Sequence, residues 1–71
     1  MKVRYDPSVD ILNIEIKDAE IANSDELQDG MIADYDEDGN IVGLEIMDAS
    51  ECVTEPDRIE YRVLSSEPVA A

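Results

Sequence analysis

The residues most suggestive of chemistry lie in an acidic stretch between positions 34 and 45. Together they satisfy the calcium-loop pattern D-x-[DN]-x-[DN]-G-x5-E, namely Asp34, Asp36, Asp38, Gly39 and Glu45. Carboxylates at alternate positions suit a hard cation, a glycine permits the sharp bend, and a final glutamate can bind through both oxygens. Taken without its surroundings, this spacing predicts an EF-hand calcium site.

The flanking sequence contradicts that interpretation, because an EF-hand loop needs a helix on each side. The entering segment contains Asp29 and Gly30 where a helix would present its apolar face, and the exiting segment is β-branched and followed by Pro56. EF-hands also occur in pairs, which 71 residues cannot accommodate. We interpret the aspartates as turn formers and predict no metal site and no cofactor. Weak cation binding by the acidic turn at 34–40 stays an alternative.

The chain offers little else for catalysis. It contains no histidine, so neither a Ser–His nor a Cys–His pair can form. Its single cysteine, Cys52, is expected to be a small, partly buried apolar side chain. Glu15 and Glu45 are conceivable acid–base groups, but paired carboxylates on the outer face of a sheet are usually solvated. We predict no catalytic residues and a protein that is not an enzyme.

Composition places the chain among small acidic domains. Its 71 residues include 19 acidic and 5 basic ones, for a formal net charge of -14. This charge repels nucleic acid and anionic membranes, and it favours either solubility alone or a basic partner. No apolar run approaches the ~20 residues of a membrane span, and a lone cysteine fits a reducing compartment, so we expect a cytoplasmic protein. We expect one domain over residues 1–64 and a flexible tail at 65–71.

A segment near the N-terminus recurs thirty residues later without a gap. The identical positions are Tyr5/Tyr35, Asp6/Asp36, Ile11/Ile41, Glu15/Glu45, Ile16/Ile46, Asp18/Asp48 and Ala19/Ala49. Each copy has a short alternating run, a polar turn, and a β-branched run with period two, which is the pattern of a β-hairpin. Pro7 favours the first turn, and Gly39 can adopt the positive φ of the second. We therefore predict two equivalent hairpins.

These hairpins predict a mainly β fold (a β-rich α+β domain) built on a four-stranded, mostly antiparallel sheet with one apolar face. The linker at 20–29 is a candidate irregular edge strand. Residues 48–51 resemble a capping box and predict a short helical turn that ends by Pro56. Residues 58–63 alternate between polar and apolar types and predict a last, C-terminal strand.

The apolar face of this sheet needs more cover than a short chain can supply. Its expected members are Val3, Tyr5, Leu12, Ile14, Ile16, Met31, Ala33, Tyr35, Val42, Leu44 and Ile46. Within the chain, only residues 49–64 are available to lie over them. We therefore predict a homo-oligomer, most simply a homodimer, formed by stacking of sheets or by pairing of the last strand across a sheet edge.

The segments at 2–7, at 10–14 and, most distinctively, at 34–50 resemble domain-of-unknown-function family 2283. The resemblance covers roughly residues 2–63, and Asn13 stands where that family often has an aromatic residue. It implies a small prokaryotic protein without an established activity. Some members look like partners of small ribonuclease-like toxins by gene neighbourhood, which implies an antitoxin-like role toward a basic partner. The resemblance assigns no functional residue.

Two functions follow as hypotheses. The first is a non-enzymatic protein-interaction module, antitoxin-like toward a basic ribonuclease-like protein, because an acidic surface suits the masking of a nucleic-acid-binding site. The second is a self-associating structural protein without a dedicated partner. A cation-binding or hydrolytic protein that uses the aspartate turn is a third, less favoured hypothesis. Co-purification discriminates among them, since they predict a basic partner, a homo-oligomer alone, and stoichiometric metal, respectively.

Overall fold

Residues 1–65 are described by the computed structural model, in which one sheet and a short helix account for the regular structure. The elements are β1 (Lys2–Asp6), β2 (Ile11–Glu15), β3 (Asn23–Gln28), β4 (Met31–Tyr35), β5 (Ile41–Met47) and α1 (Ala49–Cys52). Of the predicted flexible tail at 65–71, residues 66–71 lie outside the described residues.

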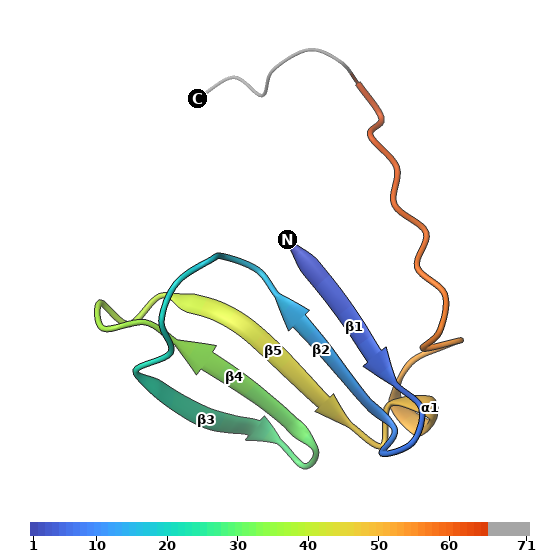
Figure 1. Cartoon of the computed structure of the whole chain (residues 1–71), viewed down its shortest axis with the longest axis horizontal. Helices are drawn as coiled ribbons and strands as arrows, with labels where there is room; N and C mark the ends of the chain where they lie inside the picture. Colours follow the sequence, from blue (N-terminus) through green and yellow to red (C-terminus); the bar gives the residue numbers. More distant parts are fainter. Residues whose placement is uncertain (66–71) are drawn as a thin grey trace.

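All five strands join one antiparallel sheet in the order β1-β2-β5-β4-β3, which confirms the predicted mainly β fold (Figure 1). The linker supplies the fifth strand, β3, and its predicted irregularity is a register shift between Glu26 and Gln28. The two predicted hairpins are β1–β2 and β4–β5, and they meet through their second strands. This central pairing makes one continuous sheet of the two hairpins.

The repeat creates an approximate two-fold axis within the chain. Ile14 and Leu44 occupy equivalent positions of the two copies, and they lie directly opposite each other where β2 pairs with β5. Leu12 faces Ile46 on one side of this point, and on the other the Ile16 N–H donates to the Val42 carbonyl at 2.8 Å. The two hairpins are therefore related to each other as the subunits of a two-fold dimer would be.

The turns of the two hairpins are equivalent even in individual hydrogen bonds. In the first copy the Ser8 N–H donates to the Asp6 carboxylate at 3.0 Å, and in the second the Asp38 N–H donates to Asp36 at 2.9 Å. Gly39 has a φ of 82°, as the sequence predicted for this turn. Both aspartates are thus turn formers, each satisfying backbone N–H groups of its own loop.

One residue interrupts the expected residue-for-residue match between the copies. Tyr5 lies opposite Leu12, whereas its equivalent Tyr35 lies opposite Ile41 instead of Val42 because the β4–β5 register shifts after Asp34. Such a bulge leaves one residue outside the ladder and re-aims its neighbours. Val42, predicted for the apolar face, is 2% exposed and lines a hollow on the opposite, polar face.

Helix α1 covers one end of the apolar face and forms the only helical layer of the described residues (Figure 1). Its Ala49 is buried with Leu12 and Ile46, and Val53 packs against this core together with four half-buried side chains of the sheet, Val3, Tyr5, Ile14 and Met31. In the part of the chain that the structure describes, no second layer of helix or strand covers the rest of the apolar face.

Three details of the C-terminal third differ from the sequence prediction. Residues 58–63 are extended but form no strand, because no strand edge lies against them to accept their hydrogen bonds. Cys52 is exposed, since the single turn of α1 directs Ala49 toward the sheet. The helical turn begins where it was predicted, but Asp48 has a φ of 50° and its side chain makes no capping bond.

Candidate functional site

The face of the sheet opposite α1 carries a buried carboxylate. Asp34, on β4, is only 3% exposed, and the Ser24 hydroxyl of β3 donates to its Oδ1 at 2.6 Å. Gly43 lies opposite Asp34 on β5, and a Cβ at that position would meet the Asp34 Oδ2 at 3.2 Å. The missing side chain of Gly43 therefore provides the space that the Asp34 carboxylate occupies.

Glu45 is the second acid of this site. Burial raises the pKa of Glu45, and the charge of Asp34 and a hydrogen bond with Asp34 raise it further. Glu45 therefore holds its proton more tightly than an isolated glutamate does. Sequence reasoning missed the pair because it interpreted Asp34 as a turn former and considered Glu45 together with Glu15. Only the register of β4 against β5 brings Asp34 and Glu45 together.

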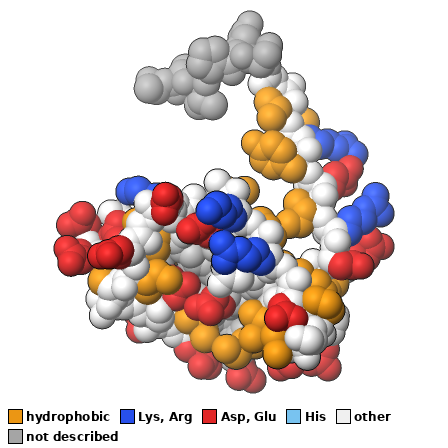
Figure 2. Space-filling view, in the orientation of Figure 1, with side chains coloured by type: hydrophobic (Ala, Val, Ile, Leu, Met, Phe, Trp, Pro, Cys, Tyr) orange, Lys and Arg blue, Asp and Glu red, His pale blue; other side chains and the backbone are white. Residues whose placement is uncertain are grey.

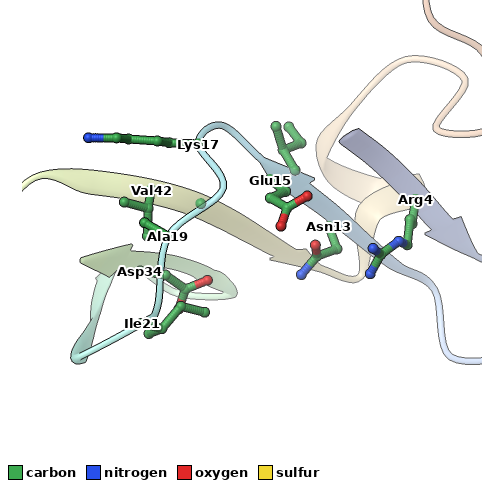
Figure 3. A pocket seen from close by; sticks show the side chains of 10 residues that line it. Arg4, Asn13, Glu15, Lys17, Ala19, Ile21, Asp34 and Val42 are labelled. Carbon is green, nitrogen blue, oxygen red and sulfur yellow. The ribbon is translucent and has the colours of Figure 1, made fainter. Parts of the chain in front are cut away.

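A shallow hollow of about 240 Å³ lies beside this pair. Figure 3 shows Arg4, Asn13 and Glu15 along one side and the apolar Ala19, Ile21 and Val42 along the other, with Lys17 directed away from them. Glu15 also faces Lys2, at 3.8 Å between charged atoms. The hollow thus offers hydrogen-bonding groups of both charges, and its lining residues include no serine, threonine, cysteine, tyrosine or histidine.

Glu15 and Glu45, considered together as acid–base groups, share this face but have different partners. Glu15 lies opposite Gly43, and Glu45 lies opposite Asn13 and Ile32. The carboxylate that perturbs Glu45 is Asp34. The equivalence of the two glutamates in the repeat therefore does not make them a functional pair.

Strands flank the acidic turn on both sides, as the argument against an EF-hand required. Its would-be ligands are dispersed: Asp34 bonds Ser24, Asp36 accepts from the N–H groups of its own turn, and Glu45 lies further along β5. Among residues 1–65, no group of three or more acidic or cysteine side chains is arranged to hold a metal ion.

A second carboxylate, Asp10, joins the first turn to the helix. The Tyr5 hydroxyl donates to Asp10 Oδ1 at 2.7 Å, the Ser50 N–H donates to the same oxygen at 3.0 Å, and the Ser50 hydroxyl donates to Oδ2 at 2.6 Å. These bonds favour the ionised form, so they lower the pKa of Asp10, the Ser50 hydroxyl having the largest effect. Asp10, which is distant from α1 in the chain, therefore caps the helix, a role that the sequence predicted for Asp48.

A protein-family model matches residues 2–50, and its description is a protein of unknown function (DUF2283). The chain belongs to this family. No curated protein and no solved structure matches it. The matched region of this DUF2283 protein contains the whole sheet and ends at Ser50, the residue that bonds Asp10. Residues 51–63, which the resemblance was expected to include, lie beyond the match.

Charge is distributed unevenly over this DUF2283 domain. Between positions 18 and 51 there are twelve acidic residues and no basic one. Four of the five basic residues lie either on β1 or beyond α1, namely Lys2, Arg4, Arg58 and Arg62. In the described part of the chain, no helix is long and apolar enough to cross a membrane. The β3–β4 side is therefore strongly anionic, whereas the β1 side is nearly balanced.

We expect Glu45→Gln to stabilise the DUF2283 fold at neutral pH. The folded pKa of Glu45 is raised, so its contribution to stability is complete below the ordinary value of 4.5 and is lost as pH rises through the folded pKa. A neutral glutamine avoids that loss and can still donate to Asp34. Chemical unfolding at pH 7 and pH 4.5 should show a gain for the variant that shrinks in acid. Glu15→Gln, on the same face, serves as the control and should show no gain; an equal gain for both variants would contradict the Asp34 coupling.

Proposed function

We propose that this protein is a non-catalytic protein-interaction domain whose anionic side binds a basic protein. The observation that supports this proposal most strongly is the uninterrupted negative charge from position 18 to position 51, where twelve acidic residues occur without a base. A field of one sign accelerates the encounter with an oppositely charged partner and discriminates against others. In this proposal, the buried carboxylate Asp34 and the half-buried carboxylate Asp10 have structural roles.

The edge strand β3 is the part of the anionic side best suited to contact. Every residue of β3 is exposed, and its outer edge pairs with no other strand of the described chain. An open edge presents backbone N–H and C=O groups to a partner, while Asp25 and Glu26 would restrict pairing with another acidic chain. A basic segment therefore meets complementary charge and available hydrogen bonds at the same place.

The finer proposal is an antitoxin-like role. A basic ribonuclease-like protein binds RNA through cationic side chains, and an acidic surface that covers them presents the same charge as the phosphates it excludes. This role, like a cytoplasmic location, comes from the family resemblance and from composition. In this role, the protein would inhibit its partner by covering the partner's RNA-binding surface.

The test is recovery of the tagged protein from its own host, followed by binding measurements with the purified partner. We expect a basic partner whose affinity falls steeply as salt rises from 50 to 300 mM, on the order of tenfold or more. Asp25→Asn/Glu26→Gln should weaken binding about tenfold, whereas Glu37→Gln/Asp38→Asn, which removes the same charge outside β3, should not. Equal loss in both variants would show that only net charge matters and would contradict a β3 site.

The same experiment addresses the alternatives. A homo-oligomer recovered alone favours the self-associating structural protein, for which the partly uncovered apolar face is the supporting observation. Stoichiometric metal favours the cation-binding hypothesis. For that case we expect calcium titration at physiological salt to show no saturable binding below about 10 μM, the weak end of sensor sites.

A further inference from the structure

The arm, which we define as residues 58–64, is a segment of the described chain that does not join the sheet. Its apolar side chains Ile59, Tyr61, Val63 and Leu64 are 57–92% exposed, and no strand pairing includes any of them. Figures 1 and 2 show the arm as an extended trace beyond β1 with apolar side chains along it. Alternating apolar and charged residues are typical of a strand with one buried face, so the arm has the pattern of a strand without a partner.

The internal two-fold axis identifies the edge that such a strand would fit. It relates β4 to β1, and the outer edge of β4 is occupied by β3, which runs antiparallel to it. Among residues 1–65, no corresponding strand lies on the outer edge of β1. Its inner face carries Val3 and Tyr5, half-buried members of the core. A sixth strand there would complete the symmetry of the sheet and extend the apolar face.

We propose that the arm pairs antiparallel with β1 of a second copy of this chain, and that two copies exchange their arms reciprocally. Apolar arm residues must share a face with Val3 and Tyr5, which allows only registers that differ by two residues. One of these sets Arg58 opposite Asp6 and Glu60 opposite Arg4, with Tyr61 opposite Val3. These two attractive pairs outnumber the one repulsive pair of this register, Arg62 opposite Lys2 at the end of the strand. The neighbouring registers set Arg62 or Arg58 opposite Arg4, which like charges disfavour.

Charge makes the β1 edge the place where two copies of an anionic chain can approach. The β3 side would bring together surfaces without a single base, whereas β1 and the arm contain four of the five basic residues. Opposite charges directly across a strand pair contribute favourably, and like charges oppose pairing. A second copy is therefore attracted to β1 and repelled by β3. Dimerisation at β1 leaves β3 free for the basic partner.

The turn that precedes the arm favours exchange over folding back onto its own sheet. Glu55 has a φ of 49°, and its carbonyl accepts from the Arg58 N–H at 2.9 Å after Pro56. The Glu55 carboxylate also lies 3.5 Å from the Arg58 guanidinium. These contacts direct the arm outward and would have to change for pairing within one chain. Pairing of Arg58 with Asp6 in the dimer would leave the backbone turn at Glu55 intact. It would compete only with the exposed ion pair between Glu55 and Arg58.

Charge reversal across the inferred pair tests both the register and the exchange. Sedimentation equilibrium at micromolar concentration should give the unaltered protein twice its mass of 7.9 kDa. Arg4→Glu or Glu60→Arg alone should shift the mass toward 7.9 kDa, because each sets like charges opposite each other. An equimolar mixture of the two variants should recover the dimer, since each arm then meets an opposite charge on the other chain.

The outcomes separate exchange from its competitors. A constant monomer mass for the unaltered protein overturns the proposal. The proposal is also overturned if the mixture stays monomeric while the double variant Arg4→Glu/Glu60→Arg behaves like the unaltered protein. That result would mean that each arm pairs with β1 of its own chain. Masses that grow beyond the dimer with concentration overturn the reciprocal, closed arrangement. Circular dichroism of each variant should match the unaltered protein, since both side chains are on the surface, and none of these results depends on a basic partner.

Discussion

Leu12→Ala is expected to remove a large fraction of the stability of this domain. Leu12 is 6% exposed and is a central member of the core with Ile46 and Ala49. Leucine truncation in a core costs about 2–5 kcal/mol, and a sheet that is covered on one side only at α1 favours the lower part of that range. Domains have roughly 0.05–0.15 kcal/mol of stability per residue, so the loss is a large fraction of the total. We expect thermal unfolding about 10–20 °C lower.

Leu27→Ala is the matched control, because it removes the same atoms from a leucine that is 52% exposed on β3. Its expected effect is below about 0.5 kcal/mol, as for an ordinary surface substitution. Urea unfolding followed by circular dichroism measures both variants. Similar losses for the two would mean that β3 is buried in solution, for example by another molecule, and that the described core is not where stability resides.

Asp10→Ala is expected to have the second largest effect, because it removes the side-chain hydrogen bonds that hold α1 against the first turn. The carboxylate accepts three hydrogen bonds, and two of them come from Ser50, forty residues away in the chain. Their loss leaves the Ser50 N–H and hydroxyl without their acceptor, while the Ala49 N–H still donates to the backbone carbonyl of residue 10. The cover over Leu12 and Ile46 is weakened as a result. Hydrogen exchange should show the Ser50 amide losing protection selectively, together with a lower unfolding midpoint.

Asp36→Ala is the control for the Asp10 substitution, because Asp36 also accepts several hydrogen bonds but only from its own turn. It should lower the unfolding midpoint less and leave the Ser50 amide protected. The pH dependence gives an independent check. The folded pKa of Asp10 is lowered, so its stabilising effect is present above the ordinary value of 3.8 and is lost as pH falls through the folded pKa. Asp10→Ala should therefore reduce the loss of stability in acid.

Local sequence was sufficient to determine the hairpins. Period-two alternation, turn residues and a thirty-residue repeat are short-range features, and each acts through the backbone of a few neighbouring residues. Asp6 and Asp36 were recognisable as turn formers because each bonds N–H groups within four positions along the chain. The absence of helices around the acidic loop was predictable for the same reason, since Gly30 and the β-branched run oppose helix formation locally.

Relations between distant residues were decided only by the tertiary structure. Asp34 and Glu45 interact because β4 and β5 pair in one particular register, and a bulge at Tyr35 then directs Val42 to the polar face. Asp10 replaces Asp48 as the helix cap because the first turn folds against Ser50. The alternating residues 58–63 have the pattern of a strand, yet a strand exists only where another edge accepts its hydrogen bonds, and a single described chain presents none to the arm.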